Sequence, residues 1–211
     1  MWWYFDNWFY KHGEMASIQQ QLLDKKARIP PMLTDNHICD ISTRGVNWMM
    51  AATHTYHRQT VLLPYAGHRS VRMGLRNFCH LNYWLIEPRG DRFADLCQDD
   101  TQEEDEDIYN INTMWHLDPL DWAGKFDPDG MQVDSLLINP PHGRAAETLM
   151  ALHPFTKERG CTAAVIDASE LLSPEREVFR RWAGKEGFTW GLLKDLFFAA
   201  YGDEHPVILF K

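Results

Sequence analysis

An asparagine and two prolines follow directly on an apolar run in the middle of the chain. Leu136, Leu137 and Ile138 lead without a break into Asn139-Pro140-Pro141-His142. A proline cannot donate to a strand ladder and its φ is fixed, so two adjacent prolines end a strand abruptly. Ligands of an open parallel sheet bind at the carboxyl ends of its strands, so this turn is a candidate site.

Two other strand ends carry residues that suit a ligand. After the apolar residues 60–63 the chain continues Pro64-Tyr65-Ala66-Gly67-His68-Arg69, where small residues allow the backbone to approach a bound molecule. Glu87 ends a second apolar run, about 20 residues further on, which is the spacing of the ribose-binding acid in dinucleotide folds. Each feature also has a purely structural interpretation, because glycines and solvated glutamates are common after strands.

These positions require strands that alternate with helices. Alternating elements of this kind predict an α/β fold with a mainly parallel sheet covered on both faces. We expect a helical, aromatic-rich extension over residues 1–59 and a Rossmann-like domain over residues 60–211, with a solvated acidic loop at 99–107. The apolar pattern predicts strands at 60–63, 81–86, 108–112, 133–138, 161–166 and 205–210, and helices at 17–27, 70–78, 92–97, 145–153 and 174–183, with 192–200 either helix or strand.

The bulk composition restricts the class of protein. The chain has 211 residues, of which 45% are hydrophobic, and a formal charge of −9. This charge argues against a general nucleic-acid coat protein but leaves room for an enzyme with one basic face. No segment has the ~18 apolar residues of a membrane helix and the start lacks a signal peptide, so we expect a cytoplasmic protein and no membrane partner. The four cysteines are scattered and predict reduced, mostly buried thiols.

The three strand ends together resemble the class I S-adenosylmethionine-dependent methyltransferases, over roughly residues 60–211. The resemblance is greatest to the branch that methylates exocyclic amino nitrogens, such as the DNA adenine-N6 methyltransferases. The family's E/D-P-x-A-G-x-G loop corresponds to residues 63–69, and its N/D-P-P-Y/F motif to Asn139-Pro140-Pro141-His142. The resemblance implies a cofactor site made of Pro64, Ala66, Gly67, the ribose-binding Glu87, and Asp118 against the adenine ring.

The resemblance also implies a fold and a chemistry. The fold is a mainly parallel, seven-stranded sheet with helices on both faces, and the cofactor is S-adenosylmethionine, without a metal. Asn139 and the carbonyl of Pro140 would accept hydrogen bonds from the target amino group, while Pro141 keeps the turn rigid. His142 would take the place of the aromatic ring that stacks on a flipped-out base. The implied partner is a nucleic acid, with DNA preferred to RNA.

Departures from the family pattern keep other interpretations open. Arg69 stands where the family has the second glycine of its loop, and His142 replaces an aromatic residue. A second hypothesis is therefore an inactive, methyltransferase-like binding or regulatory subunit, with the aromatic N-terminus as its protein interface. A third is a methyltransferase for RNA, protein or a small molecule. The basic residues near the first loop could bind phosphates or form a solvated helix face; they are Arg58, Arg69, Arg72 and Arg76. Residues 167–170 could contact substrate or have a structural role.

Overall fold

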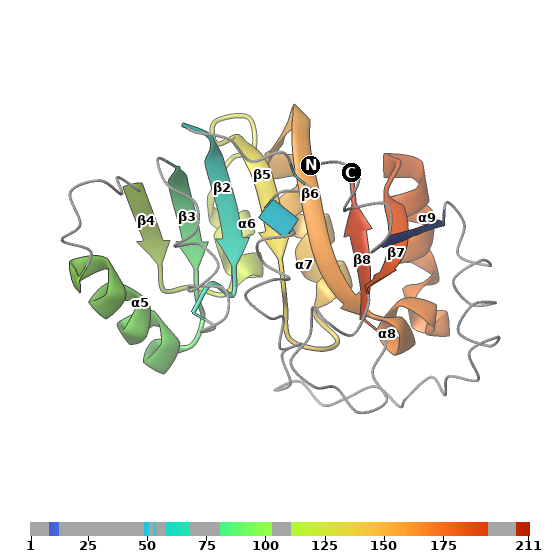
Figure 1. Cartoon of the computed structure of the whole chain (residues 1–211), viewed down its shortest axis with the longest axis horizontal. Helices are drawn as coiled ribbons and strands as arrows, with labels where there is room; N and C mark the ends of the chain where they lie inside the picture. Colours follow the sequence, from blue (N-terminus) through green and yellow to red (C-terminus); the bar gives the residue numbers. More distant parts are fainter. Residues whose placement is uncertain are drawn as a thin grey trace.

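The computed structural model describes residues 9–12, 49–50, 53, 58–67, 81–102, 111–193 and 206–211. These residues build one eight-stranded sheet with helices packed against it (Figure 1). The strands are β1 (Phe9–His12), β2 (Thr60–Pro64), β3 (Asn82–Ile86), β4 (Ile111–Trp115), β5 (Val133–Ile138), β6 (Thr156–Asp167), β7 (Thr189–Leu193) and β8 (Pro206–Phe210). The helices are α5 (Gly90–Gln102), α6 (Pro119–Lys125), α7 (Ala145–Leu152), α8 (Ala168–Leu172) and α9 (Glu177–Glu186), with short 3₁₀ turns η1 (His153–Phe155) and η2 (Pro174–Arg176).

The strand order is β1-β7-β8-β6-β5-β2-β3-β4. Five neighbouring strands, from β6 to β4, are parallel, while β8 runs antiparallel to β6 and β7, and β1 antiparallel to β7. The chain passes from β2 outward to β3 and β4, and then returns to β5 and β6 on the other side of β2. The order in which the chain adds strands therefore reverses between β2 and β5. This topological switch point is where ligands bind in sheets of this kind.

Alternate residues of the central strands enter two separate cores. Leu62 of β2 packs on the face covered by α6, α7 and α9, and its neighbours Val61 and Leu63 pack on the opposite face with Leu96 of α5. Burial on both faces is what makes such strands continuously apolar. Each fully buried large side chain contributes about 1.5–3 kcal/mol, so the two cores hold the strand ends of the site on a rigid support.

The predicted mainly parallel α/β sheet is confirmed, but its strand number is corrected from seven to eight. The added strand is β1, which lies at the outer edge beside β7. A four-residue segment has too little alternation to predict a strand. Most of residues 1–59 lie outside the described residues, so the division of the chain at residue 59 stays a prediction; the predicted helices at 17–27 and 70–78 lie outside them too.

Several element bounds differ from the sequence-based prediction. Helix α5 continues to Gln102, into the acidic run predicted as a loop, because solvated acids suit an exposed helix as well as a loop. Strand β6 begins at Thr156 rather than at residue 161. The sequence-based prediction missed its first half because that half is largely exposed and charged, without the apolar pattern of a buried strand. The predicted helix at 174–183 is the 3₁₀ turn η2 followed by α9, and Ser173 makes no capping hydrogen bond with its side chain.

The last part of the chain was predicted only in part. For residues 192–200 the sequence allows either helix or strand; the structure has the strand β7 from Thr189 to Leu193, and residues 194–200 lie outside the described part. The strand predicted at 108–112 begins later, at Ile111. By contrast, β5 has the predicted bounds, because the two prolines end it.

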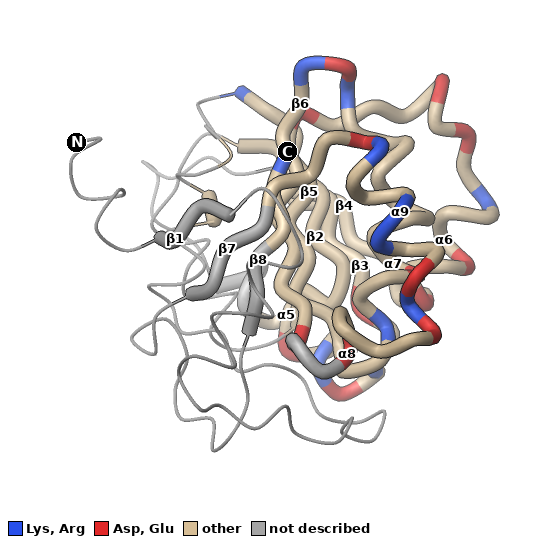
Figure 2. The backbone as a smooth tube through the Cα atoms, turned by 90° about the vertical axis from the view of Figure 1, so that its right-hand side faces the viewer, with Lys and Arg blue, Asp and Glu red and all other residues tan. Residues whose placement is uncertain are grey.

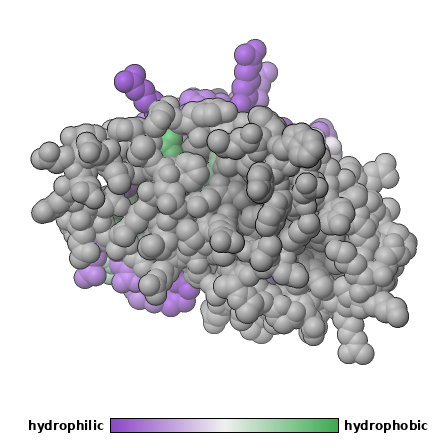
Figure 3. Space-filling view, viewed as in Figure 1, coloured by the Kyte–Doolittle hydropathy of each residue, from purple (hydrophilic) through white to green (hydrophobic). Residues whose placement is uncertain are grey.

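The described surface is polar and of mixed charge. Lysines, arginines and acids alternate on the side shown in Figure 2 rather than gathering by sign. The hydrophilic residues at the lower left of Figure 3 occupy the place of α5 in Figure 1. On α5, Cys97 is exposed, against the expectation of a buried thiol, and Cys161 is half-buried; Cys39 and Cys79 lie outside the described residues, so the prediction of mostly buried thiols stays a prediction. In the described chain no helix is both long and apolar enough to cross a membrane.

Candidate active site at the carboxyl edge of the sheet

The loops after β2 and β5 lie on either side of the switch point. Residues 65–67 follow β2, and Asn139-Pro140-Pro141 follows β5, its hydrogen-bonded parallel neighbour. Glu87 follows β3 and Asp118 lies shortly after β4 on the same edge. The structure therefore brings all the predicted site residues to the carboxyl edge of the parallel strands, as the sequence analysis expected of ligand-binding positions.

The loop after β2 is held from both sides. Tyr65 is buried and has a positive φ of 60°, which is uncommon for a residue with a side chain. Its hydroxyl lies 3.3 Å from Oγ1 of Thr148 on α7, and burial raises its pKa. The next residue, Ala66, donates its N–H to the carbonyl of Ile86 at 3.2 Å. The loop is thus fixed to both β3 and α7, in a conformation that costs roughly 1–3 kcal/mol of local strain.

Glu87 connects the loop after β2 to the end of β3. Its carboxylate is 1% exposed and accepts N–H hydrogen bonds from Gly67 and Arg89, both at 2.9 Å. Burial raises the pKa of this carboxyl, and the two backbone hydrogen bonds act in the opposite direction. A carboxylate has about four acceptor positions, so two remain beyond these contacts, and both are covered in this structure.

Gly67 needs to be glycine because of its close contacts. A Cβ at this position would lie 2.5 Å from Cβ of Arg92 and 2.8 Å from Oε2 of Glu87. Both distances are too short for a real side chain. The sequence suggests that this glycine allows a ligand to approach, and the structure shows that packing within the chain also requires it.

Asp118 already has two roles in the chain. It is the N-cap of α6, where its side chain accepts the N–H of Leu120 at 2.9 Å. It also forms an ion pair with Arg144, whose Nη2 lies 3.0 Å from the same oxygen, Oδ1. Its side chain keeps 27% of its surface exposed, so its second oxygen can still meet a ligand. Arg144, two residues after Asn139-Pro140-Pro141-His142 (the acceptor motif), was not predicted as a site residue.

The acceptor motif lies at the end of β5 with most of its surface covered. Asn139 is 6% and His142 5% exposed, Pro140 is buried and Pro141 is half-buried. The turn closes at Gly143, which has a φ of 78°. The predicted stacking of His142 on a base therefore requires this ring to move outward, and its role stays a prediction.

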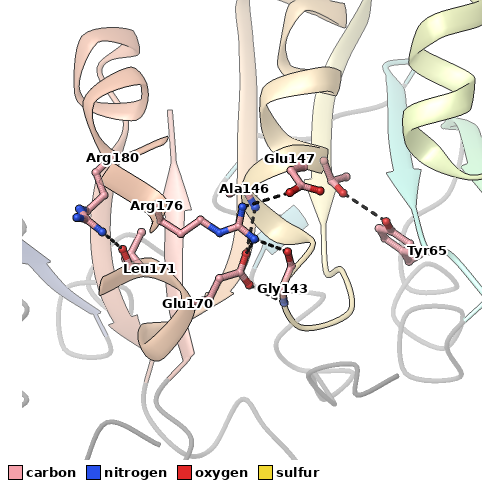
Figure 4. A network of polar contacts seen from close by, with 9 residues as sticks. Tyr65, Gly143, Ala146, Glu147, Glu170, Leu171, Arg176 and Arg180 are labelled. Atoms are coloured by element: carbon pink, nitrogen blue, oxygen red, sulfur yellow. Dashed lines mark hydrogen bonds and ion pairs between the residues drawn. The ribbon is translucent and has the colours of Figure 1, made fainter. Parts of the chain in front are cut away.

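Two charged side chains that the sequence analysis did not assign to the site hold this turn. Glu170 on α8 is 2% exposed and accepts N–H hydrogen bonds from Gly143 at 3.0 Å and Ala146 at 3.4 Å. Arg176 donates to the carbonyl of Gly143, and Nη2 lies 3.5 Å from Glu170 (Figure 4). The position of Glu170 just after a strand is a sequence signal for a site residue, whereas nothing in the sequence indicates Arg176.

Other predicted features lie partly outside the described residues. Those outside are Arg69, Arg72 and Arg76. The effect of Arg69, which stands where the family has the second glycine of its loop, therefore stays untested. Arg58 is described, is exposed, and has a φ of 66°. Within the described ranges no group of three His, Cys, Asp or Glu side chains could hold a metal ion.

Comparison with known proteins defines the class of fold. No model of a protein family matches the sequence, and no curated protein matches it. Among solved structures, a protein assigned as a methylase from Haemophilus influenzae has 18% identity and a TM-score of 0.50, over 78% of this chain and 83% of that one. TYW2 from Pyrococcus horikoshii, solved with MeSAdo, has 15% identity and a TM-score of 0.52, over 79% of this chain and 60% of that one.

A protein from Pyrococcus horikoshii assigned as an RNA methyltransferase gives a similar result, with 13% identity and a TM-score of 0.52 over 80% of each chain. At these identities the likeness concerns the fold. The chain has the Rossmann-like fold of the class I methyltransferases, as its sequence predicted.

Proposed function

We propose that the protein is an S-adenosylmethionine-dependent methyltransferase that acts on an exocyclic amino nitrogen, with adenine N6 in DNA as the first candidate. The observation that carries the proposal is the position of Asn139-Pro140-Pro141 at the end of β5, beside the switch point of a methyltransferase fold. An amide oxygen and a proline carbonyl on a rigid turn suit the recognition of an amino group.

The proposed cofactor residues fit S-adenosylmethionine. Pro64, Ala66 and Gly67 form the loop beside the cofactor, Glu87 offers its two remaining acceptor positions to the ribose, and Asp118 offers its second oxygen to the adenine ring. When bound, the cofactor supplies an electrophilic methyl group. Because Glu87 is 1% exposed, the loop after β2 has to shift before a ribose can reach it.

The acceptor residues orient the nucleophile. The side chain of Asn139 and the carbonyl of Pro140 accept hydrogen bonds from the target amino group, which fixes the direction of its lone pair. Pro141 limits movement of the turn. Positioning of this kind, together with electrostatic stabilisation, accounts for most of the acceleration in such a site. A base in duplex DNA has to leave the stack first, at a cost of a few kcal/mol.

RNA is the second candidate acceptor. The observation that favours it is that solved structures with this fold include one assigned as an RNA methyltransferase. The mixed charge of the described surface does not favour RNA over DNA, because binding of either nucleic acid requires a basic face. An inactive, methyltransferase-like subunit is the alternative from another class, and the burial of Glu87 and His142 favours it.

The test has two parts, cofactor binding and methyl transfer. Calorimetric titration with S-adenosylmethionine should give micromolar binding that Glu87→Ala and Glu87→Gln both weaken. The matched control is Glu158→Ala, an exposed glutamate on β6. Tritiated cofactor should then label adenine-containing duplex DNA, and Asn139→Ala should abolish labelling while cofactor binding stays nearly unchanged.

Each outcome has a definite meaning. Labelling of structured RNA but not of DNA would replace the first candidate acceptor by the second. An Asn139→Ala variant that keeps full activity would overturn the role of the motif. A folded protein that binds no cofactor would contradict the enzyme proposal and favour the inactive subunit.

A further inference from the structure

Two charged side chains hold the backbone of the turn that follows the acceptor motif. We call the hydrogen bonds that Glu170 and Arg176 form with Gly143 the grip. Gly143 donates its N–H to Oε2 of Glu170 at 3.0 Å, and its carbonyl accepts from Nη2 of Arg176 at 2.5 Å. Both polar groups of this one residue are therefore taken by side chains from the segment after β6 (Figure 4). The left-handed conformation of Gly143, with φ 78°, directs them toward that segment.

The same two side chains also secure the start of α7. The N-cap of this helix, Arg144, makes no capping hydrogen bond with its side chain. Glu170 supplies the missing acceptor instead, with Oε1 at 3.4 Å from the N–H of Ala146. Arg176 reaches Glu147 in the first turn of the helix, at 3.3 Å. A carboxylate at this end of a helix is favourable because the unpaired N–H groups and the helix dipole both attract negative charge.

The two gripping side chains are themselves held in place. Glu170 is 2% exposed and lies 3.5 Å from Nη2 of Arg176, whose side chain is 17% exposed. Arg180 on α9 donates to the carbonyls of Leu171 and Ser173, at 2.7 and 2.6 Å, and so fixes the bend between α8 and η2 that presents Arg176. Arg180 therefore stabilises the segment that carries Glu170 and Arg176, and these two side chains in turn hold the backbone of residues 141–144 (the acceptor turn).

We infer that Glu170 and Arg176 are positioning residues, which fix residues 141–144 and thereby set the direction of the Asn139 side chain and the Pro140 carbonyl. Neither residue needs to touch the substrate in this role. The catalytic part of the inference rests on the proposed function; the grip on the turn does not. A displacement of about 1 Å at a reacting group can cost on the order of 10²-fold in rate, so loosening this turn should reduce kcat.

The test combines exchange of backbone amides with kinetics. Glu170→Gln keeps the volume but replaces one acceptor by a donor, and Arg176→Met removes the guanidinium. Hydrogen exchange of a peptide spanning residues 139–147 should become at least about tenfold faster in both variants. Binding of S-adenosylmethionine should stay within about twofold, and kcat should fall on the order of 10²-fold. Arg176→Lys, which keeps the charge, should recover part of the loss.

The controls come from a matched pair on α9. Arg181 and Glu177 form an ion pair at 3.1 Å, but both side chains are exposed, at 72% and 63%, and neither holds the acceptor turn. Arg181→Met and Glu177→Gln should therefore leave both exchange and kcat at the wild-type values. Circular dichroism would show that each variant is folded.

Two results would overturn the inference. Unchanged exchange in the 139–147 peptide of both test variants would show that the grip does not hold the turn. Faster exchange with unchanged kcat would show that the turn is held for stability alone. A wild-type protein that transfers no methyl group would instead refute the proposed function, and the exchange experiment would still decide whether the grip exists.

Discussion

Two buried glutamates stand at the same edge of the sheet and make the same kind of contact. Glu87 accepts the N–H of Gly67 in the loop after β2, and Glu170 accepts the N–H of Gly143 in the turn after β5. Each accepts a second backbone N–H, and burial raises the pKa of both. In both halves of the site a carboxylate from one strand end therefore organises the loop of another.

The two glutamates differ in what else surrounds them. Glu170 has the guanidinium of Arg176 at 3.5 Å, whereas Glu87 forms no ion pair with any residue in the described part of the chain. A carboxylate with two N–H groups and a guanidinium has little capacity left, so Glu170 suits a purely structural role. Glu87 retains acceptor positions and suits a ligand. This difference is the reason why we propose a ligand-binding role for Glu87 and a structural role for Glu170.

The largest effect should come from removing the structural carboxylate. Glu170→Ala removes one of the two ion-pair partners that Arg176 has in the described chain, leaving only the exposed Glu147, and it removes the carboxylate that accepts the N–H groups of Gly143 and Ala146. Breaking a buried pair in this way should lower the free energy of unfolding by about 3 kcal/mol, measured by urea denaturation. Glu177→Ala, at an exposed position, should change it by less than about 0.5 kcal/mol. A similar small loss in both variants would remove the distinction between Glu170 and a surface residue.

A smaller effect should distinguish the two glycines. Gly67→Ala forces a Cβ against Arg92 and Glu87, which should cost about 2 kcal/mol of stability by overpacking. Gly143→Ala opposes the positive φ and should cost about 1 kcal/mol. Thermal unfolding of both variants gives the comparison. An equal or reversed order would mean that the loop after β2 relaxes more easily than its contacts indicate.

The smallest effect concerns pH. The folded pKa of Glu87 is raised by burial, so its favourable contribution is complete below the pKa of the unfolded chain and is lost as pH rises through the folded pKa. The stability of Glu87→Gln relative to the wild type should therefore increase between pH 4 and pH 7. Urea denaturation at both pH values measures this difference. A decrease over that interval would show that hydrogen bonding, not burial, dominates the environment of Glu87.

Sequence reasoning placed the candidate site residues at one edge of the sheet because prolines, glycines and strand-end carboxylates act locally. Pro140 and Pro141 end β5 at the predicted residue, and Glu87 and Asn139 fall on the predicted edge. The grip on Gly143 was not predictable, because its contacts join residues 27 and 33 positions apart. The burial of His142 has the same origin, since only the folded chain determines what covers a side chain.

Strand β1 has a consequence for how the protein behaves at high concentration. The described sheet ends at β1 on one side and β4 on the other, with four and five residues. Without β1, the unpaired backbone of β7 would form the border and could pair with another molecule. With β1 in place the border is a strand of only four residues, and very short edge strands are one way in which proteins limit pairing between molecules.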